Sequence, residues 1–188
     1  MKYSDITLGR IEAVWNKLGG EEGVDLFLRG EFVLENKFLK RIARVAVGGA
    51  KWFVPKDHIQ SANIGRMDDG FRMFFLDKVE ENVNGTIIVV HQLEKDSLDV
   101  SILAELGDHA QISLAHFFEL LEKQSKGESG QLLTNGYAMI AYIIDKDGNT
   151  RAVNAIWSDA RRYWVVYANL VESPSRWHEG HQVLSRDS

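Results

Sequence analysis

Residues 137–171, YAMIAYIIDKDGNTRAVNAIWSDARRYWVVYANLV, contain three apolar segments separated by two short polar connections. The segments are rich in β-branched and aromatic residues, which favour strands. The predicted strands are residues 137–144, 151–157 and 162–171. The connections are too short to hold a crossover helix, so neighbouring strands must run antiparallel. This stretch therefore predicts an antiparallel meander.

A helix is predicted at residues 113–124, before the meander. Its apolar residues recur at helical spacing, at Leu114, Phe117, Phe118 and Leu121. Ser113 stands at the N-cap position, where its hydroxyl accepts a backbone hydrogen bond. Ile112 and Phe117 are spaced for a hydrophobic staple. The following residues 125–130, SKGESG, are typical of a loop. We therefore expect this helix to pack on the meander.

Further strands are predicted upstream of this helix. TIIVVHQL at 86–93 is a β-branched run typical of a buried strand. Shorter strands are expected at 71–76, FRMFFL, and at 100–103. The rest of residues 50–84 shows no clear periodicity and is a candidate join between two halves of the chain.

Two short helices are predicted at the N-terminus, on either side of the glycines in LGGEEG. The first, at residues 7–18, has apolar residues at helical spacing, namely Leu8, Ile11, Val14, Trp15 and Leu18. Gly19 follows at a position where a left-handed residue caps a helix. Glu21 and Glu22 open the second helix with negative charge at its positive end, and Gly30 ends it. The glycines predict the corner of an αα-hairpin.

This glycine segment fits two binding motifs poorly. A phosphate-binding loop needs a lysine entering a helix, whereas LGGEEG has two glutamates where the phosphate would bind. A DNA-reading helix-turn-helix needs hydrogen-bond donors near the start of its second helix. Here Arg29, the only basic residue of that helix, lies at its far end. A structural corner, or a segment that docks onto a partner protein, fits better.

Residues 36–47, NKFLKRIARVAV, are predicted to form a helix with one basic face. Asn36 is placed as its N-cap. The apolar face comprises Phe38, Ile42 and Val45, and the basic face comprises Lys37, Lys40, Arg41 and Arg44. The basic residues can bind the phosphates of a nucleic acid or an anionic protein surface, or form a solvated face. The preceding residues 31–35 fit either a strand or the start of this helix.

The composition is that of an ordinary soluble globular protein. Apolar residues make up 45% and charged residues 26% of the 188-residue chain. Cysteine is absent, which excludes disulfides and thiolate metal sites. No apolar run is long enough to cross a membrane, and the first residues lack the apolar core of a secretory signal. We therefore expect a cytoplasmic protein without membrane partners.

The predicted fold class is α+β, with an N-terminal helical hairpin followed by a helix packed on an antiparallel meander sheet. We expect a mainly helical segment at residues 1–60 and an α+β body at 61–188, or a single domain over 1–188. The net charge is −5, and the acidic excess lies after residue 60. The body therefore has no general attraction to nucleic acid or anionic lipid.

Two loops contain oxygen or nitrogen ligands, but neither matches a metal site. In a calcium loop counted from the start of DKDGN at 145–149, position 6 would be Thr150 instead of glycine and position 12 would be Ile156. We interpret this segment as a hairpin turn. His178 and His181 lack the further ligands of a zinc site, and we expect a tail in which the neighbouring tryptophan packs on the sheet. The sequence therefore predicts that the protein binds neither a metal nor a cofactor.

The remaining candidates for chemistry are histidines and aromatic residues. Three histidines, His91, His109 and His116, are candidate acids or bases, although the chain lacks the G-x-S-x-G nucleophile motif. Trp157 and Trp164 lie on neighbouring predicted strands. They belong either to the core or to an exposed aromatic face that binds a peptide, a sugar or bases.

WNKLGGEEGVDLFLRGE at 15–31 resembles the start of a family of bacterial proteins. NGYAMIAYIIDKDGNTRAV at 135–153 and VESPSRWHEGHQVLSR at 171–186 are similar to the later part of such proteins. These relatives place the N-terminal segment before unlike bodies. The resemblance implies a bacterial source and a shared fold, and it implies no activity, cofactor or catalytic residue.

The sequence thus predicts a protein that acts by binding another protein and not by catalysis. The N-terminal helices and their basic flank are the expected contact. One alternative is a nucleic-acid-associated protein that uses Lys37, Lys40, Arg41 and Arg44. A second alternative is a small hydrolase with one of the three candidate histidines in a cleft.

Overall fold

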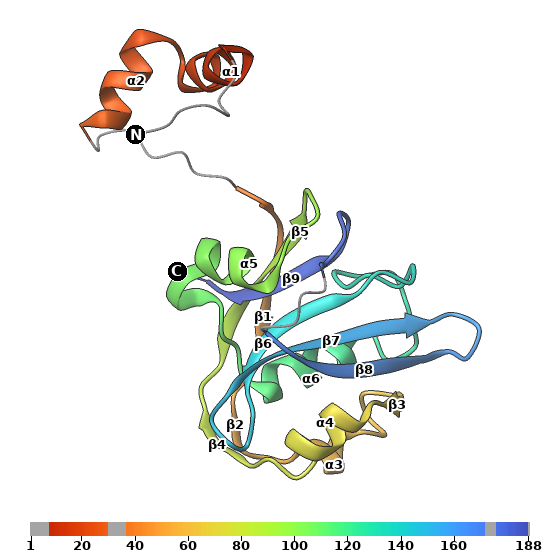
Figure 1. The fold of residues 1–188 in the computed structure, drawn as a ribbon. Coiled ribbons are helices and arrows are strands. Elements are labelled where there is room, and N and C mark those ends of the chain that lie inside the picture. The colour runs from red at the N-terminus through yellow and green to blue at the C-terminus, as the bar shows by residue number, and fades with distance from the viewer. Residues whose placement is uncertain (1–7, 30–36, 172–175, 188) are drawn as a thin grey trace. The chain divides into compact units, whose positions relative to one another are not determined.

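The computed structural model describes residues 8–29, 37–171 and 176–187 (Figure 1). The chain divides into two compact units, Met1–Lys37 and Phe38–Ser188. The division falls after residue 37, so residues 38–60 belong to the second unit. No helix in the described ranges is both long and apolar enough to cross a membrane.

The described part of the first unit consists of α1 (Leu8–Leu18) and α2 (Glu21–Leu28), close to the predicted bounds. Gly19 and Gly20 join them with φ of 89° and 80°, values that glycine adopts without a steric cost. A Cβ on Gly23 would lie 1.5 Å from the carbonyl oxygen of Leu18. The third glycine of LGGEEG therefore allows α2 to contact the last turn of α1.

The second unit is built on a sheet that has seven strands among the described residues (Figure 1). In chain order the strands are β1 (Leu39–Val47), β3 (Ile64–Met67), β5 (Thr86–Leu93), β6 (Met139–Ile144), β7 (Thr150–Ser158), β8 (Tyr163–Leu170) and β9 (Gln182–Arg186). Their order across the sheet is β1-β5-β9-β6-β7-β8-β3. The β6–β9 and β3–β8 pairs are parallel, and the other pairs are antiparallel. With its helices, this mixed sheet confirms the α+β class.

The strands β6, β7 and β8 form the predicted antiparallel meander. Residues 145–149 make the turn between β6 and β7, with Gly148 at φ 88°. Trp157 and Trp164 are cross-strand partners on β7 and β8, and their ring centroids are 5.0 Å apart. Both tryptophans are buried, so this pair belongs to the core and not to an exposed aromatic face.

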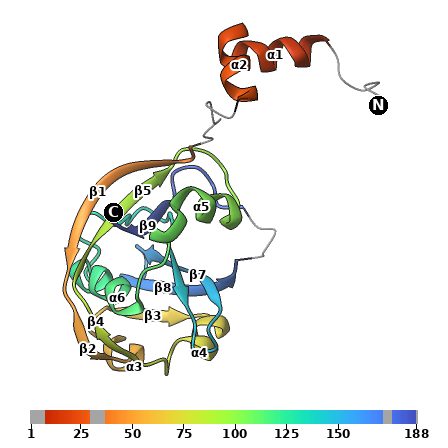
Figure 2. The same ribbon diagram turned by 90° about the vertical axis from the view of Figure 1, so that its left-hand side faces the viewer.

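Helices cover both faces of the sheet (Figure 2). They are α4 (Asp69–Phe74) and α6 (Leu114–Lys123) in one core cluster and α5 (Asp99–Leu106) in the other. The short helix α3 (Pro55–His58) contacts α6. The strands β2 (Ala50–Phe53) and β4 (Glu80–Val83) form a separate two-stranded sheet. Ser113 Oγ accepts a hydrogen bond from the His116 N–H, which confirms the predicted N-cap of α6. Along β6, Met139 packs in the cluster that contains α6, and Ile140 packs in the cluster that contains α5. Successive strand residues point to opposite faces, so both faces of β6 are buried.

The prediction of a helix at residues 36–47 is wrong, because residues 39–47 form β1. The more buried residues alternate along this strand, at Ala43, Val45 and Val47. β1 pairs with β5 along its whole length, and this distant partner overrides the weak helical pattern. The predicted cap Asn36 and residues 31–35 lie outside the described residues.

Two short segments predicted as strands are helices, which corrects the assignments at 71–76 and 100–103. Asp68 caps α4 by accepting a hydrogen bond from a backbone N–H three residues later. α5 buries Ile102 and Leu106, which lie one helical turn apart. Segments this short hold too few apolar residues to distinguish a period of two from a period of 3.6.

The C-terminal tail contributes β9, a strand that the sequence analysis does not predict. β9 lies between β5 and β6. Val183 and Leu184 are buried on opposite faces, in the two core clusters. Before the strand, the indole of Trp177 donates a 2.7 Å hydrogen bond to buried Asp99. The tail is therefore part of the core.

Candidate functional site

Apolar side chains are exposed on both helices of the first unit. We call Leu8, Ile11, Val14, Trp15, Phe27 and Leu28 the N-terminal apolar surface. Leu8 is 85% exposed and Leu28 is 75% exposed. Among the residues of this unit whose burial is described, Leu18 and Gly23 are buried. The exposed acidic residues of α2 are Glu21, Glu22 and Asp25. α2 thus combines apolar and acidic surface, whereas α1 exposes charges of both signs at Arg10 and Glu12.

The predicted basic residues lie on or next to the strand β1, and not on a helix. Arg41 and Arg44 both form ion pairs with Asp187, which follows β9, and the Arg41 Nη2 to Asp187 Oδ1 distance is 3.7 Å. Lys40 is exposed on the same strand, and Lys37 lies at the end of the first unit. The structure therefore brings two of the four cations together around one carboxylate, which offsets part of their charge.

The three candidate histidines lie apart and without carboxylate partners among the described interactions. His91 on β5 has its Nε2 2.9 Å from Ser185 Oγ. Buried His116 has its Nε2 2.9 Å from the carbonyl oxygen of Asn84, and His109 is exposed in the 3-10 turn after α5. A general base usually needs an orienting partner and a nucleophile within hydrogen-bond reach, and these positions do not supply that arrangement.

One cluster that sequence reasoning missed contains a serine, a histidine and a carboxylate. Glu122 Oε1 accepts a 2.5 Å hydrogen bond from Ser61 Oγ and lies 3.2 Å from His58 Nδ1. The serine hydroxyl thus faces the carboxylate, and the carbonyl oxygen of His58, a second acceptor, lies 3.1 Å from the same Oγ. Activation of a nucleophile requires the hydroxyl to face the imidazole, so this cluster joins α3 to α6 structurally.

The histidines of the tail are held by neighbouring loops. His178 Nδ1 lies 3.1 Å from Asp96 Oδ2, and His181 Nδ1 accepts a hydrogen bond from the Ala138 N–H at 3.0 Å. Burial, together with the neighbouring His178, lowers the pKa of His181. In the described ranges, no three His, Asp or Glu residues gather as a potential metal site.

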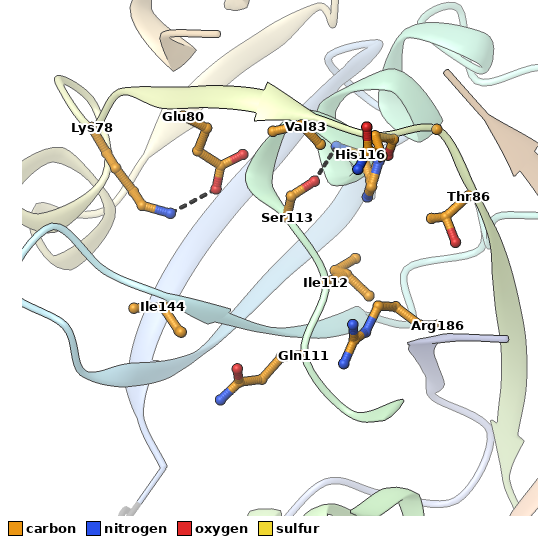
Figure 3. A pocket seen from close by; sticks show the side chains of 12 residues that line it. Lys78, Glu80, Val83, Thr86, Gln111, Ile112, Ser113, His116, Ile144 and Arg186 are labelled. Atoms are coloured by element: carbon orange, nitrogen blue, oxygen red, sulfur yellow. Dashed lines mark hydrogen bonds and ion pairs between the residues drawn. The ribbon is translucent and has the colours of Figure 1, made fainter. Parts of the chain in front are cut away.

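A pocket of about 460 Å³ lies at the N-terminal end of α6 (Figure 3). Glu80 on β4 accepts hydrogen bonds from the N–H groups of Leu114 at 3.0 Å and Ala115 at 2.9 Å. Lys78 Nζ lies 2.6 Å from the same carboxylate. These contacts satisfy the first N–H groups of the helix, which would otherwise lack partners.

The C-terminal ends of two strands also line this pocket. Ile144 ends β6 and Arg186 ends β9, and both line the pocket with Gln111. In Figure 3, Lys78 and Glu80 lie at one end and Arg186 and Gln111 at the other. These residues come from separate segments and form no linear motif, so the sequence alone does not predict the pocket.

Comparison with known proteins does not assign this chain to a family. No protein-family model, curated protein or solved structure matches this chain.

The pKa of His91 predicts how stability depends on pH. Burial, together with the charge of Arg41, lowers this pKa to about 4. Between pH 6.5 and pH 4, the His91 side chain is mostly protonated in the unfolded state and mostly unprotonated in the folded state. The free energy of unfolding is therefore largest above pH 6.5 and decreases as the pH falls toward 4. The decrease is at most about 1.4 kcal/mol per pH unit, and solvent screening makes it smaller because the side chain is only part-buried.

Urea unfolding at several pH values between 4 and 7 tests this expectation. The His91→Gln variant should lose less stability on acidification than the wild type. His109→Gln, at an exposed position, should follow the wild-type curve. Identical curves for wild type and His91→Gln would show that His91 does not control the acid response.

Proposed function

We propose that this protein acts by binding another protein through the N-terminal apolar surface. The observation that carries the proposal is the exposure of six large apolar side chains on two helices of 11 and 8 residues. Helices this short are marginally stable without a packing partner. Amphipathic helices commonly bind by placing their apolar face in a groove.

The chemistry of the unit indicates what the partner presents. We infer that α1 and α2 act as one helical hairpin, as the glycine corner predicts. Its partner would offer an apolar groove with basic residues at the rim, opposite the exposed acidic residues of α2, since complementary charge favours association. The absence of cysteine and the sequence resemblance support a bacterial cytoplasmic protein.

The two alternatives have less support. Binding of nucleic acid through Lys37, Lys40, Arg41 and Arg44 is weakened by the ion pairs of both arginines with Asp187. Hydrolysis is disfavoured because His91, His109 and His116 have no carboxylate partner among the interactions of the described residues. We therefore propose a non-enzymatic binding protein.

Site-specific photo-crosslinking in cells tests the proposal with the full chain. A crosslinker at Leu28 should capture one protein species, and a crosslinker at exposed Glu12 should capture it far less. Leu8→Ser with Leu28→Ser removes two largely exposed leucines, and should weaken binding of the purified partner by roughly 10- to 100-fold. The matched control Glu12→Ala should bind as the wild type does.

Three results would count against this function. One is capture of many proteins in proportion to their abundance, and another is equal binding by the double-serine variant. The third is crosslinking of the chain to a second copy of itself, with a dimer in analytical ultracentrifugation. That result would replace the separate partner with self-association.

A further inference from the structure

We infer that the pocket at the N-terminal end of α6 binds a small organic anion that carries a carboxylate or phosphate group. This inference does not rest on the N-terminal apolar surface, which belongs to the other unit. The pocket volume of about 460 Å³ lies within the range of about 300–1,000 Å³ that is typical of small-molecule sites.

The charges that line the pocket favour an anion. Glu80 contributes negative charge, but its oxygens already accept two backbone N–H groups and contact Lys78. Arg186 donates a hydrogen bond to the carbonyl oxygen of Asp108, a neutral acceptor. Among the described residues, Arg186 has no carboxylate partner, so its positive charge is not offset at close range.

Lys78 is the second cation that lines the pocket, and its position also favours an anionic ligand. Lys78 is only 15% exposed and Glu80 10% exposed at their side chains, so their pair is a fixed part of the wall. An ammonium group carries three donors, and the contact with Glu80 uses one. Lys78 therefore retains donors for a ligand, while the helix N-terminus itself is occupied by Glu80 and is not the anion site.

A buried polar atom in the pocket wall remains without a partner. His116 is 5% exposed and lines the pocket. Its Nε2 donates to the carbonyl oxygen of Asn84, which makes Nδ1 an acceptor in the neutral ring, and Nδ1 has no hydrogen bond among the described residues. Buried polar atoms are seldom left unpaired, and a hydroxyl group on the ligand would satisfy this one.

The arrangement indicates how the ligand would lie. The planar guanidinium of Arg186 suits two parallel hydrogen bonds to a carboxylate or phosphate. Ile112 and Ile144, which also line the pocket, provide apolar contact for the body of the ligand. Because both anionic groups match a guanidinium, the structure names their shared chemistry, and separate probes distinguish them.

Two measurements on the full chain test the site. Native mass spectrometry of the purified protein should show a bound small anion that is lost on denaturation. An NMR titration would use succinate, inorganic phosphate and the neutral diester dimethyl succinate, each up to about 10 mM. The amide signals of residues 111–116 and 86 should shift with at least one of the two anions and should not shift with the diester. The anion that binds identifies the source.

Variants of Arg186 complete the test. Arg186→Gln should weaken binding of that anion by roughly 10- to 100-fold, and Arg186→Lys should retain part of the affinity. Arg161→Gln, an exposed arginine outside the pocket, is the matched control. Unchanged affinity in Arg186→Gln, equal shifts with the diester, or no co-purified mass together with no shift by any probe would each overturn the inference.

Discussion

A chain that lacks residues 176–188 is expected to lose the folded second unit. The deletion removes β9, which pairs with both β5 and β6, and leaves two strand edges inside the sheet without hydrogen-bond partners. It also removes the buried side chains of Val183 and Leu184, each worth about 1.5–3 kcal/mol. Together these losses approach the total stability of a typical domain, about 5–15 kcal/mol.

The tail also satisfies a buried carboxylate, which adds to the cost of its removal. Asp99 Oδ1 accepts hydrogen bonds from the Tyr142 hydroxyl at 2.8 Å and the Trp177 indole at 2.7 Å. Burial raises the pKa of Asp99, although these two hydrogen bonds act in the opposite direction. Without Trp177, half of this support is lost.

Far-ultraviolet circular dichroism and a thermal melt measure the effect of the deletion. The point variant Leu184→Ala should cost about 2–5 kcal/mol by leaving a cavity in the core. Deletion of residues 1–29, which lie in the other unit, should leave the main melting transition within a few degrees of the wild type. A cooperative, wild-type melt of the tail deletion would contradict the central position of β9.

The second large effect is expected from Asp145→Ala, which breaks a buried ion pair. Asp145 Oδ2 lies 2.6 Å from Arg151 Nε, and the two side chains are 0% and 9% exposed. The carboxylate also accepts the N–H groups of Asp147 and Asn149, both at 2.9 Å. Removing it leaves a buried cation and two turn N–H groups without a partner, at a cost of about 3–5 kcal/mol.

Acid should diminish the difference between this variant and the wild type. Burial acts to raise the pKa of Asp145, but the hydrogen bonds from Arg151, Asn149 and Asp147 outweigh it and lower the pKa below its usual value of 3.8. The carboxylate therefore contributes stability above pH 3.8, and this contribution is lost as the pH falls through the lowered pKa.

Denaturant unfolding at pH 7 and at pH 3 measures both parts of this prediction. Exposed Asp147→Ala in the same turn is the control and should cost less than about 0.5 kcal/mol. Replacing Asp145 and Arg151 together by apolar residues should recover part of the loss, because no charge is then buried alone. A cost at pH 7 no larger than that of Asp147→Ala would show that the pair does not stabilise the fold.

The sequence predicts well those helices and strands that are specified by residues close together in the chain. The meander has long β-branched segments and short turns, and α6 carries its own cap at Ser113. Turn chemistry and capping depend on residues within a few positions of one another. These elements are therefore readable without knowledge of the rest of the chain.

The segment at 36–47 shows where this reasoning fails. Its apolar residues fit a helical spacing at Phe38, Ile42 and Val45 and an alternating spacing at Ala43, Val45 and Val47. The choice depends on β5, which begins 39 residues after the end of β1 and offers an edge to pair with. Strand preference is largely a preference for such a neighbour.

By itself the sequence determined the α+β class, the meander, the capped helix α6 and the two short helices α1 and α2 on either side of the glycines. Tertiary structure alone decided that the tail forms β9, that the basic segment is a strand and that Lys78, Glu80, Arg186 and His116 line one pocket. The physical reason is the range of the interactions. Caps and turns depend on interactions within a few residues. Strand pairing and pocket formation instead bring together groups that are distant in the chain, and these groups become neighbours only when the whole sheet has formed.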